Sequence, residues 1–89
     1  MKAIFHEKAL KEYMDWQIQD RQKSKKVNEL LKDILRNGID QGIGQPEPLK
    51  YDYTGYWSRR IDKENRLIYK VDESGNLFIK SCKGHYDNK

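Results

Sequence analysis

Side chains that can move protons lie far apart in this sequence of 89 residues. Glu47 stands between Pro46 and Pro48, and the two prolines restrict the backbone on either side of its carboxylate. His85 follows Gly84 near the end of the chain, and an imidazole is the side chain best suited to proton transfer near neutral pH. A restrained carboxylate and an imidazole are candidates for a general base and a general acid.

Arginines in the second half of the chain are candidate phosphate ligands. Arg59 and Arg60 lie within the run GYWSRRI, and Arg66 begins the run RLIYKV after a short connection. Guanidinium groups on neighbouring strands can share one face of a sheet, and their planar fork matches phosphate oxygens. The sequence leaves open which of Arg59 and Arg60 faces Arg66, because that depends on the register of the turn.

Together these residues are the parts needed to cleave RNA without a metal ion. The 2′-OH of the substrate attacks, a base removes its proton, an acid protonates the departing 5′-oxygen, and cations stabilise the phosphoryl oxygens. One cysteine, Cys82, and two distant histidines do not form a zinc site, so we expect no metal and no cofactor. Each feature alone also fits an ordinary alternative: a stiff surface turn at Glu47, a solvated sheet face at the arginines, and a frayed end at His85.

Composition narrows the class of protein and its partners. The length is that of a single domain, residues 1–89, and the formal charge of +4 favours a polyanion or an acidic protein as partner. The first residues, MKAIFHEKAL, become charged too early for a signal peptide, and no run approaches the ~20 apolar residues of a membrane span. We expect a cytoplasmic protein that does not contact a membrane.

Hydrophobic periodicity predicts two helices after a short strand at 2–5. The first helix is expected to bury one stripe made of Leu10, Tyr13, Met14, Gln17 and Ile18, with Trp16 at its flank. The second is expected to bury Val27, Leu30, Leu31, Ile34 and Leu35, which repeat at i, i+3, i+4, i+7 and i+8. Gly38 is placed as its C-terminal cap. Between the helices, RQKSKK is interpreted as a connection with Ser24 as N-cap.

The second half of the chain is expected to form the sheet. Residues 37–54 hold both prolines and show neither periodicity, so they are predicted to be a long loop, which is uncommon unless it has a function. The runs GYWSRRI, RLIYKV and LFIKSC predict three antiparallel strands in a meander. The fold class is therefore α+β, an antiparallel sheet packed by two N-terminal helices.

Several longer stretches resemble the YoeB/Txe toxins of bacterial toxin–antitoxin modules, within the RelE-like superfamily. They are YMDWQ, KKVNELLKDI, GIGQPEPLKYDYTGYWSRRIDKENRLIYKV and CKGHY, which together span the chain from the first strand to Tyr86. The resemblance implies the compact microbial-RNase-like α+β fold of the RelE-like family. It also implies a ribosome-dependent mRNA interferase, which enters the ribosomal A site and cuts the codon there.

The resemblance further implies roles for individual residues. The general base of the family falls on Glu47, its general acid on His85, and Arg66 matches the arginine that stabilises the transition state. Supporting positions that contact phosphate or base are matched by Lys50, Arg60 and Tyr86. Arg59 is expected to contact ribosomal RNA or to lie on the surface.

The end of the chain departs from some relatives of that family. Lys83-Gly84 stands where they carry Arg-Tyr, so a stacking ring is missing and the positive charge takes another form. Substrate positioning is expected to differ, while proton transfer is retained with His85 and Tyr86. We expect 84–86 to be docked against the sheet and 87–89 to be unattached.

Partners follow from the same resemblance. They are the 70S ribosome and its mRNA, a YefM-like antitoxin with an acidic C-terminal segment, operator DNA only through the antitoxin complex, and a second copy in a homodimer. A rival function is a non-catalytic module of the same fold that binds the ribosome or acts as a DNA-binding co-repressor. It would need the arginines but not Glu47 together with His85. A third possibility, a generic RNA-binding α+β domain, lacks a recognisable RNA-recognition motif.

Overall fold

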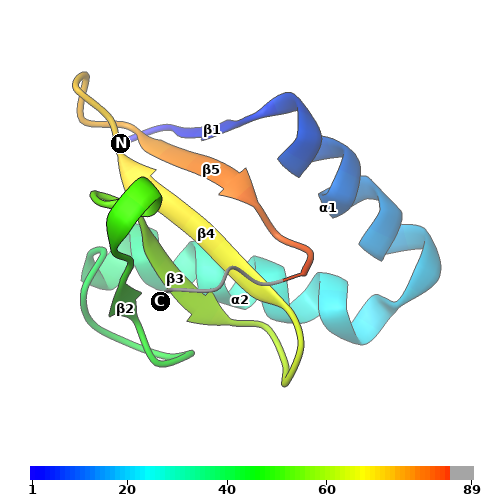
Figure 1. Cartoon of the computed structure of the whole chain (residues 1–89). Coiled ribbons are helices and arrows are strands. Elements are labelled where there is room, and N and C mark those ends of the chain that lie inside the picture. Colours follow the sequence, from blue (N-terminus) through cyan, green and yellow to red (C-terminus); the bar gives the residue numbers. More distant parts are fainter. Residues whose placement is uncertain (85–89) are drawn as a thin grey trace.

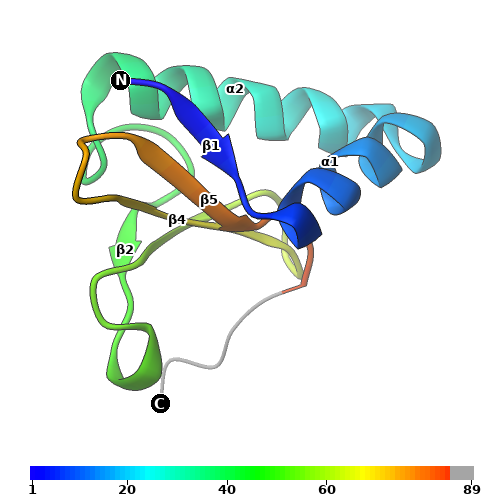
Figure 2. The same cartoon turned by 90° about the horizontal axis from the view of Figure 1, so that it is seen from above.

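Two helices cover one face of a five-stranded sheet in the computed structural model, which describes residues 1–84 (Figure 1). The elements are β1 (Ala3–Phe5), α1 (Glu7–Gln19), α2 (Arg21–Asn37), β2 (Glu47–Pro48), the 3-10 helix η1 (Tyr51–Tyr53), β3 (Trp57–Arg60), β4 (Arg66–Val71) and β5 (Leu77–Ser81). The strand order is β1-β5-β4-β3-β2. Figure 2 shows both helices on one side of the sheet and η1 on the other.

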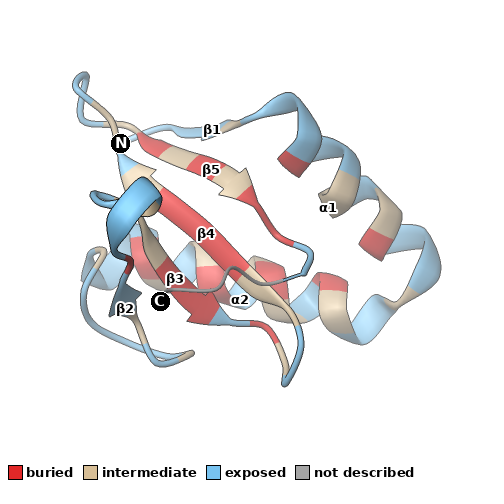
Figure 3. Ribbon diagram, viewed as in Figure 1, coloured by how far each residue is buried: buried red, intermediate tan, exposed pale blue. Residues whose placement is uncertain are grey.

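The expected α+β class with two packed helices is confirmed, and its sheet needs one correction. Strands β3 to β5 pair antiparallel as predicted, and β2, inside the predicted loop, also pairs antiparallel with β3. However, β1 pairs parallel with β5, so the sheet is mixed. The helices separate β1 from the rest of the sheet in sequence, and they provide the long crossover that a parallel pair requires. Buried residues concentrate in β3, β4 and β5 and on the side of α2 toward them (Figure 3).

The buried stripe of α1 matches the predicted one only at Tyr13, which is half-buried against the core. Leu10, Met14 and Ile18 are exposed, and Ile18 keeps 85% of its surface. Ala9 and Trp16 are buried instead, because α1 packs closely on the end of β5. There the Trp16 indole Nε1 donates a hydrogen bond of 2.8 Å to the carbonyl of Cys82. A small residue and one large ring fit this close approach better than the stripe of aliphatic residues does.

Helix α2 begins earlier than predicted. Its N-cap is Asp20, whose carboxylate accepts hydrogen bonds from the backbone N–H groups of Gln22 and Lys23. The stretch RQKSKK is therefore helical, and the prediction of Ser24 as N-cap is wrong, because Ser24 lies buried inside the helix. Gly38 is confirmed as the C-cap, with a φ of 97° that favours glycine.

Arg59 is fully buried between the sheet and α2. Its guanidinium forms an ion pair with Asp33 of α2 and donates a hydrogen bond of 2.9 Å from Nε to the hydroxyl of Tyr69. It also donates to the backbone carbonyls of Gly38, Gln41 and Ile43. The expected surface or ribosomal contact of Arg59 is therefore wrong, because every part of the side chain is used inside the protein.

The ion pair also acts on the acidic partner. The hydrogen bond from Arg59 holds the pKa of Asp33 below its usual value, and further hydrogen bonds from the Ile43 backbone and the Asn37 amide add to this. The Tyr69 hydroxyl in turn donates a hydrogen bond of 2.6 Å to the carbonyl of Ile39. Residues 38–43 thus wrap around one buried cation.

Two glycines allow this loop to lie so close to the helix. Gly42 and Gly44 have φ of 120° and 82°, where other residues are strained. A Cβ at Gly42 would lie 1.8 Å from a carboxylate oxygen of Asp33, and one at Gly44 would lie 2.7 Å from Leu30. The predicted loop 37–54 is therefore ordered, and it also contains β2 and η1, which are too short to leave a periodic pattern.

We expect Arg59→Met to destabilise the protein strongly. It would leave Asp33 and several loop carbonyls without their donor, and loss of one partner of a buried pair costs about 3–5 kcal/mol. The measurement is the midpoint of urea unfolding followed by circular dichroism. The matched control is Arg60→Met, an exposed neighbour, for which a change within about 0.5 kcal/mol is expected. Equal effects of the two substitutions would contradict the structural role of Arg59.

Candidate active site on the open face of the sheet

The sheet face opposite α1 and α2, here called the open face, carries three of the seven predicted site residues. Arg59 points to the helices, so its neighbours Ser58 and Arg60 point to the open face, because side chains alternate along a strand. Glu47 pairs with Ser58, and Arg60 pairs with Arg66. Residues paired directly across two strands share a face, so Glu47, Arg60 and Arg66 all lie on the open face.

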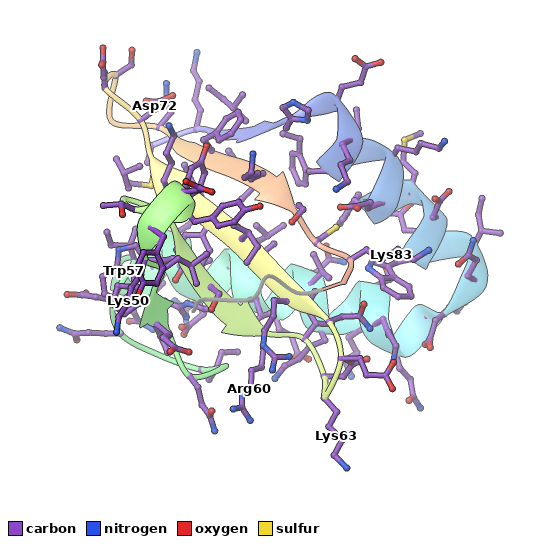
Figure 4. All side chains as sticks on the ribbon, in the orientation of Figure 1. Lys50, Trp57, Arg60, Lys63, Asp72 and Lys83 are labelled. Carbon is purple, nitrogen blue, oxygen red and sulfur yellow. The ribbon has the colours of Figure 1, made fainter. Side chains whose placement is uncertain are left out.

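The register decides between the two adjacent arginines. Arg60, not Arg59, faces Arg66. The Arg60 side chain is exposed and lines an open hollow together with Lys26 and Lys63, and Figure 4 shows Arg60 and Lys63 pointing outward at the same edge. The backbone N–H of Arg60 donates to the carbonyl of Gly44 at 2.7 Å. The loop around Arg59 thereby fixes the end of β3 as well.

Glu47 lies on the edge strand β2 and is exposed. The strand is held by its pairing with β3 and by a hydrogen bond of 2.9 Å from Leu49 N–H to the carbonyl of Tyr56. Gln45 and Tyr51 on either side have φ of 55° and 56°. This left-handed backbone costs a non-glycine residue roughly 1–3 kcal/mol and persists only where surrounding contacts impose it. The segment between them is therefore restrained, as the prolines suggest.

Lys50 follows β2 after Leu49 and occupies the N-cap position of η1, without a capping hydrogen bond from its side chain. Its side chain is exposed, and Figure 4 shows it beside β2 at the same edge of the sheet. The structure thus brings Lys50 to the edge strand that carries Glu47.

Arg66 begins β4 and is half-buried on the open face. Its Nη1 donates to the backbone carbonyls of Asp62 at 2.8 Å and Asn65 at 3.2 Å, with a longer bond to Lys63. Within residues 1–84, these bonds use neither Nε nor Nη2. The turn therefore orients the guanidinium and leaves two nitrogens able to bind an anion.

The chain leading to His85 is attached beside Arg66. Gly84 N–H donates to the side-chain oxygen of Asn65 at 2.8 Å, and Arg66 N–H donates to the carbonyl of Gly84 at 2.8 Å. Gly84 is thus docked, as predicted. His85 and Tyr86, as well as 87–89, lie outside the described residues, so their predicted arrangement stays a prediction.

Asp62 holds the turn that carries these contacts. Its carboxylate accepts hydrogen bonds from the Asn65 amide and from the backbone N–H groups of Glu64 and Asn65. It also pairs with Lys23 of α2 at 2.6 Å. Partial burial of this carboxylate favours its neutral form, but the hydrogen bonds outweigh that effect and hold the pKa of Asp62 well below its usual value. A continuous polar path therefore runs from α2 through the turn to Gly84.

Asn65 and Asp62 are positioning residues that the sequence analysis did not single out. The signal that could have found them is the Asp-x-x-Asn pattern in the β3–β4 turn, since aspartate and asparagine side chains bond to nearby backbone groups in turns. Such a pattern predicts a turn but does not predict that the turn binds the distant end of the chain.

The described residues offer neither a reactive thiol nor a metal site. Burial raises the pKa of the Cys82 thiol to about 12, so the thiol is not a nucleophile at neutral pH.

Residues 1–84 contain no group of three His, Cys, Asp or Glu side chains arranged to hold a metal ion. No helix in this described part of the chain has the length and apolar character needed to cross a membrane.

Comparison with known proteins gives matches over nearly the whole chain. Residues 5–86 match the model of the YoeB-like toxins of bacterial type II toxin–antitoxin systems. The chain is 45% identical over 86 residues to Toxin YoeB of Escherichia coli (strain K12), covering 97% of this chain and 100% of that protein. Toxin YoeB of Synechocystis is also 45% identical, with 97% and 98% covered.

Solved structures agree with these matches. A YoeB/ParE toxin from Agrobacterium tumefaciens has a TM-score of 0.91 at 40% identity, with 97% of this chain and 100% of that chain covered. The toxin in a YoeB-YefM complex from Staphylococcus aureus has a TM-score of 0.88 at 48% identity, with 97% and 98% covered. YafQ from E. coli, at 17% identity and a TM-score of 0.76 over 94% and 92% of the chains, shares the fold.

We expect Asp62→Asn to destabilise the protein in a way that depends on pH. The folded-state pKa of Asp62 is depressed, so its contribution is complete above the unfolded value of about 3.9 and is lost as the pH falls below it. At pH 7 the melting temperature should fall by about 5 °C, which corresponds to roughly 1 kcal/mol in a domain of this size. Thermal unfolding from pH 7 to pH 2 measures the difference.

The difference between the unaltered chain and the variant should shrink as the pH falls below about 4. Asp52→Asn, which changes an exposed carboxylate in η1, is the matched control and should change little at any pH. A difference for Asp62→Asn that stays constant down to pH 2 would show that its ionised carboxylate is not the stabilising group.

Proposed function

Because this chain belongs to the family of YoeB-like toxins of bacterial type II toxin–antitoxin systems, we propose that it is a ribosome-dependent endoribonuclease. It would enter the ribosomal A site, cleave the mRNA there and stop translation. One structural observation carries the chemical part of this proposal. Glu47 and Arg66 lie on the same open face, and the segment that leads to His85 is bound beside Arg66.

The spacing of these groups suits an RNA phosphate. Glu47 and Arg66 lie on β2 and β4, on either side of β3, and neighbouring strands are about 4.8 Å apart, so the two backbones are about 10 Å apart across the sheet. A carboxylate and a guanidinium that reach over β3 from both sides can hold a phosphodiester between them. The restrained backbone of β2 and the bonds from the turn to Arg66 reduce the freedom of both groups, which favours a fixed reacting geometry.

The reaction uses the 2′-OH of the RNA as nucleophile. Glu47 takes the proton of the 2′-OH as its oxygen attacks phosphorus, and the bond from phosphorus to the 5′-oxygen breaks. His85 gives its proton to the departing 5′-oxygen, and Arg66 stabilises the charge on the phosphoryl oxygens. The products are a 2′,3′-cyclic phosphate and a free 5′-OH, and the atoms balance without a cofactor. Lys50, Arg60 and Tyr86 would contact the RNA around this point.

The proposal includes protein partners. A relative from Staphylococcus aureus was solved as a YoeB-YefM complex and as a YoeB dimer. We propose a YefM-like antitoxin and a homodimer for this chain too, with operator DNA bound only through the antitoxin complex. The charge of +4 suits an acidic partner segment, since opposite charges speed and orient association. The site of action would be the cytoplasm, where ribosomes translate.

We expect Glu47→Gln and His85→Ala each to lower the rate of mRNA cleavage at least about 100-fold, the usual contribution of an acid or base. The measurement is the mapping of mRNA 5′ ends in a translation extract that contains intact ribosomes. Glu73→Gln, an exposed glutamate in the β4–β5 turn, is the matched control and should cleave like the unaltered chain. If both variants produce the same new 5′ ends as the unaltered chain, the catalytic assignment is wrong. If the unaltered chain itself arrests translation without producing new ends, the non-catalytic module is favoured.

We expect Arg66→Ala to lose cleavage while the protein stays folded, because the guanidinium stabilises charge that develops on the phosphate. Arg66→Lys should recover only part of the activity, since an ammonium group cannot make the bidentate contact. Circular dichroism and 5′-end mapping are measured on the same preparations. An unfolded Arg66→Ala would mean that the bonds from Nη1 to the turn are the main role of this arginine.

A further inference from the structure

Two lysines and two aromatic rings form a cluster on the open face, away from Arg66. The Nζ of Lys70 lies 4.9 Å from the ring centroid of Tyr56, and the Nζ of Lys80 lies 5.4 Å from the same centroid. Lys70 also lies 5.7 Å from the ring centroid of Phe78. All four side chains are partly buried. We call Tyr56, Lys70, Phe78 and Lys80 the lysine–tyrosine cluster.

The sheet itself places this cluster beside the candidate active site. Lys70 is four residues beyond Arg66 on β4, so the two share the open face and lie about 13 Å apart at roughly 3.3 Å per residue. Lys70 pairs with Phe78 on β5. The ladder then shifts, because Tyr69 pairs with Ile79 and Ile68 with Ser81, which leaves Lys80 as an extra residue. Lys80 comes two residues after Phe78 and so faces the same side of the sheet, where its ammonium group approaches Tyr56.

The charges of the cluster are not compensated by acidic side chains of the described chain. Among residues 1–84, the ion pairs use Lys8, Lys23 and Arg59, and neither Lys70 nor Lys80 pairs with a carboxylate. Two ammonium groups that share one ring repel each other, while the ring attracts each of them and limits its movement. A bound anion would relieve the repulsion between two cations that are already held in place.

We propose that Lys70 and Lys80 bind the phosphate backbone of the RNA strand beyond the nucleotides held by Glu47 and Arg66, with Tyr56 as a positioning residue. This inference rests on the proposed function, because it extends the same face by at least one nucleotide. Grooves that bind single strands combine cations that follow the backbone with aromatic side chains, and the cluster has both. An acidic peptide would use the two cations but would gain nothing from their continuity with Glu47 and Arg66 on one face.

The test measures binding of the full-length protein to a short fluorescent single-stranded RNA at several salt concentrations. The RNA carries 2′-O-methyl groups, so it has no nucleophile and stays intact. The logarithm of the association constant falls as the logarithm of the salt concentration rises, and each phosphate contact makes this slope steeper by about 0.7 for a single strand. We expect the double variant Lys70→Met and Lys80→Met to reduce the slope by about 1.4.

A matched double variant, Lys11→Met and Lys32→Met, removes the same charge from exposed positions on the helices. It should leave the slope nearly unchanged. Equal slopes for the two double variants would overturn the proposal, because net charge alone would then explain the effect. The proposal would also be overturned if the Lys70 and Lys80 double variant bound a glutamate-rich peptide more weakly but kept the salt slope for RNA. That result would assign the cluster to a protein partner.

A second variant tests the role of Tyr56. Tyr56→Phe keeps the ring and should keep the slope, whereas Tyr56→Leu removes the attraction for both ammonium groups and should weaken RNA binding. Circular dichroism checks that both variants are folded. Equal binding by Tyr56→Leu and the unaltered chain would remove the positioning role of the ring.

Cleavage in the translation extract separates this proposal from the proposed function. The Lys70 and Lys80 double variant should need about tenfold more protein for half-maximal cleavage, at unchanged positions in the mRNA. If the unaltered chain cleaves nothing, the proposed function fails, while the salt slope still decides whether the cluster binds phosphate. If cleavage is normal in the double variant and the slope is unaltered, only the cluster proposal fails.

Discussion

The buried guanidinium of Arg59 is the constraint on which the rest of the structure depends. A charge without exposure to water is tolerated only when an opposite charge and further hydrogen bonds replace the water. Asp33 supplies the charge, and the Tyr69 hydroxyl and three loop carbonyls supply the remaining acceptors. Residues 38–43 must therefore run past α2 in one path, and that path delivers the chain to β2 and to Glu47.

Helix α2 fixes the other end of the open face in a similar way. Lys23 of α2 binds Asp62, Asp62 holds Asn65, and Asn65 binds the backbone of Gly84. The same helix thus positions both the loop before Glu47 and the segment before His85. The loop that leads to Glu47 and the backbone of Gly84 are thus both connected to α2 by a chain of polar contacts, although they lie far apart in the sequence.

The sequence predicts most of the elements, because their patterns are strong and local. The stripe of α2, in which Leu35 is exposed and the prediction of its burial is wrong, and the alternation in β3 to β5 suffice for the α+β class. Other features depend on tertiary contacts that no local pattern reveals. Arg59 and Arg60 are adjacent and chemically alike, and only the register with Arg66 decides which is buried. Trp16 displaces the aliphatic stripe of α1 because β5 approaches closely there. The prolines single out Glu47 as a candidate, whereas no local pattern indicates the role of Asn65, because its partner lies 19 residues away.

Some cations of this protein pair with a carboxylate and stabilise the fold, whereas others lie on the open face without such a partner. The net charge alone does not reveal this difference. Lys23 and Arg59 are paired with Asp62 and Asp33, and both pairs serve to hold loops against α2. Arg66, Lys70 and Lys80 share the open face without an ion pair to residues 1–84. Carboxylates that the scaffold uses for its own arginine and lysine are no longer able to neutralise this face. Arg66, Lys70 and Lys80 therefore give the open face positive charge that the ion pairs of residues 1–84 leave uncompensated, which would favour an anionic ligand there.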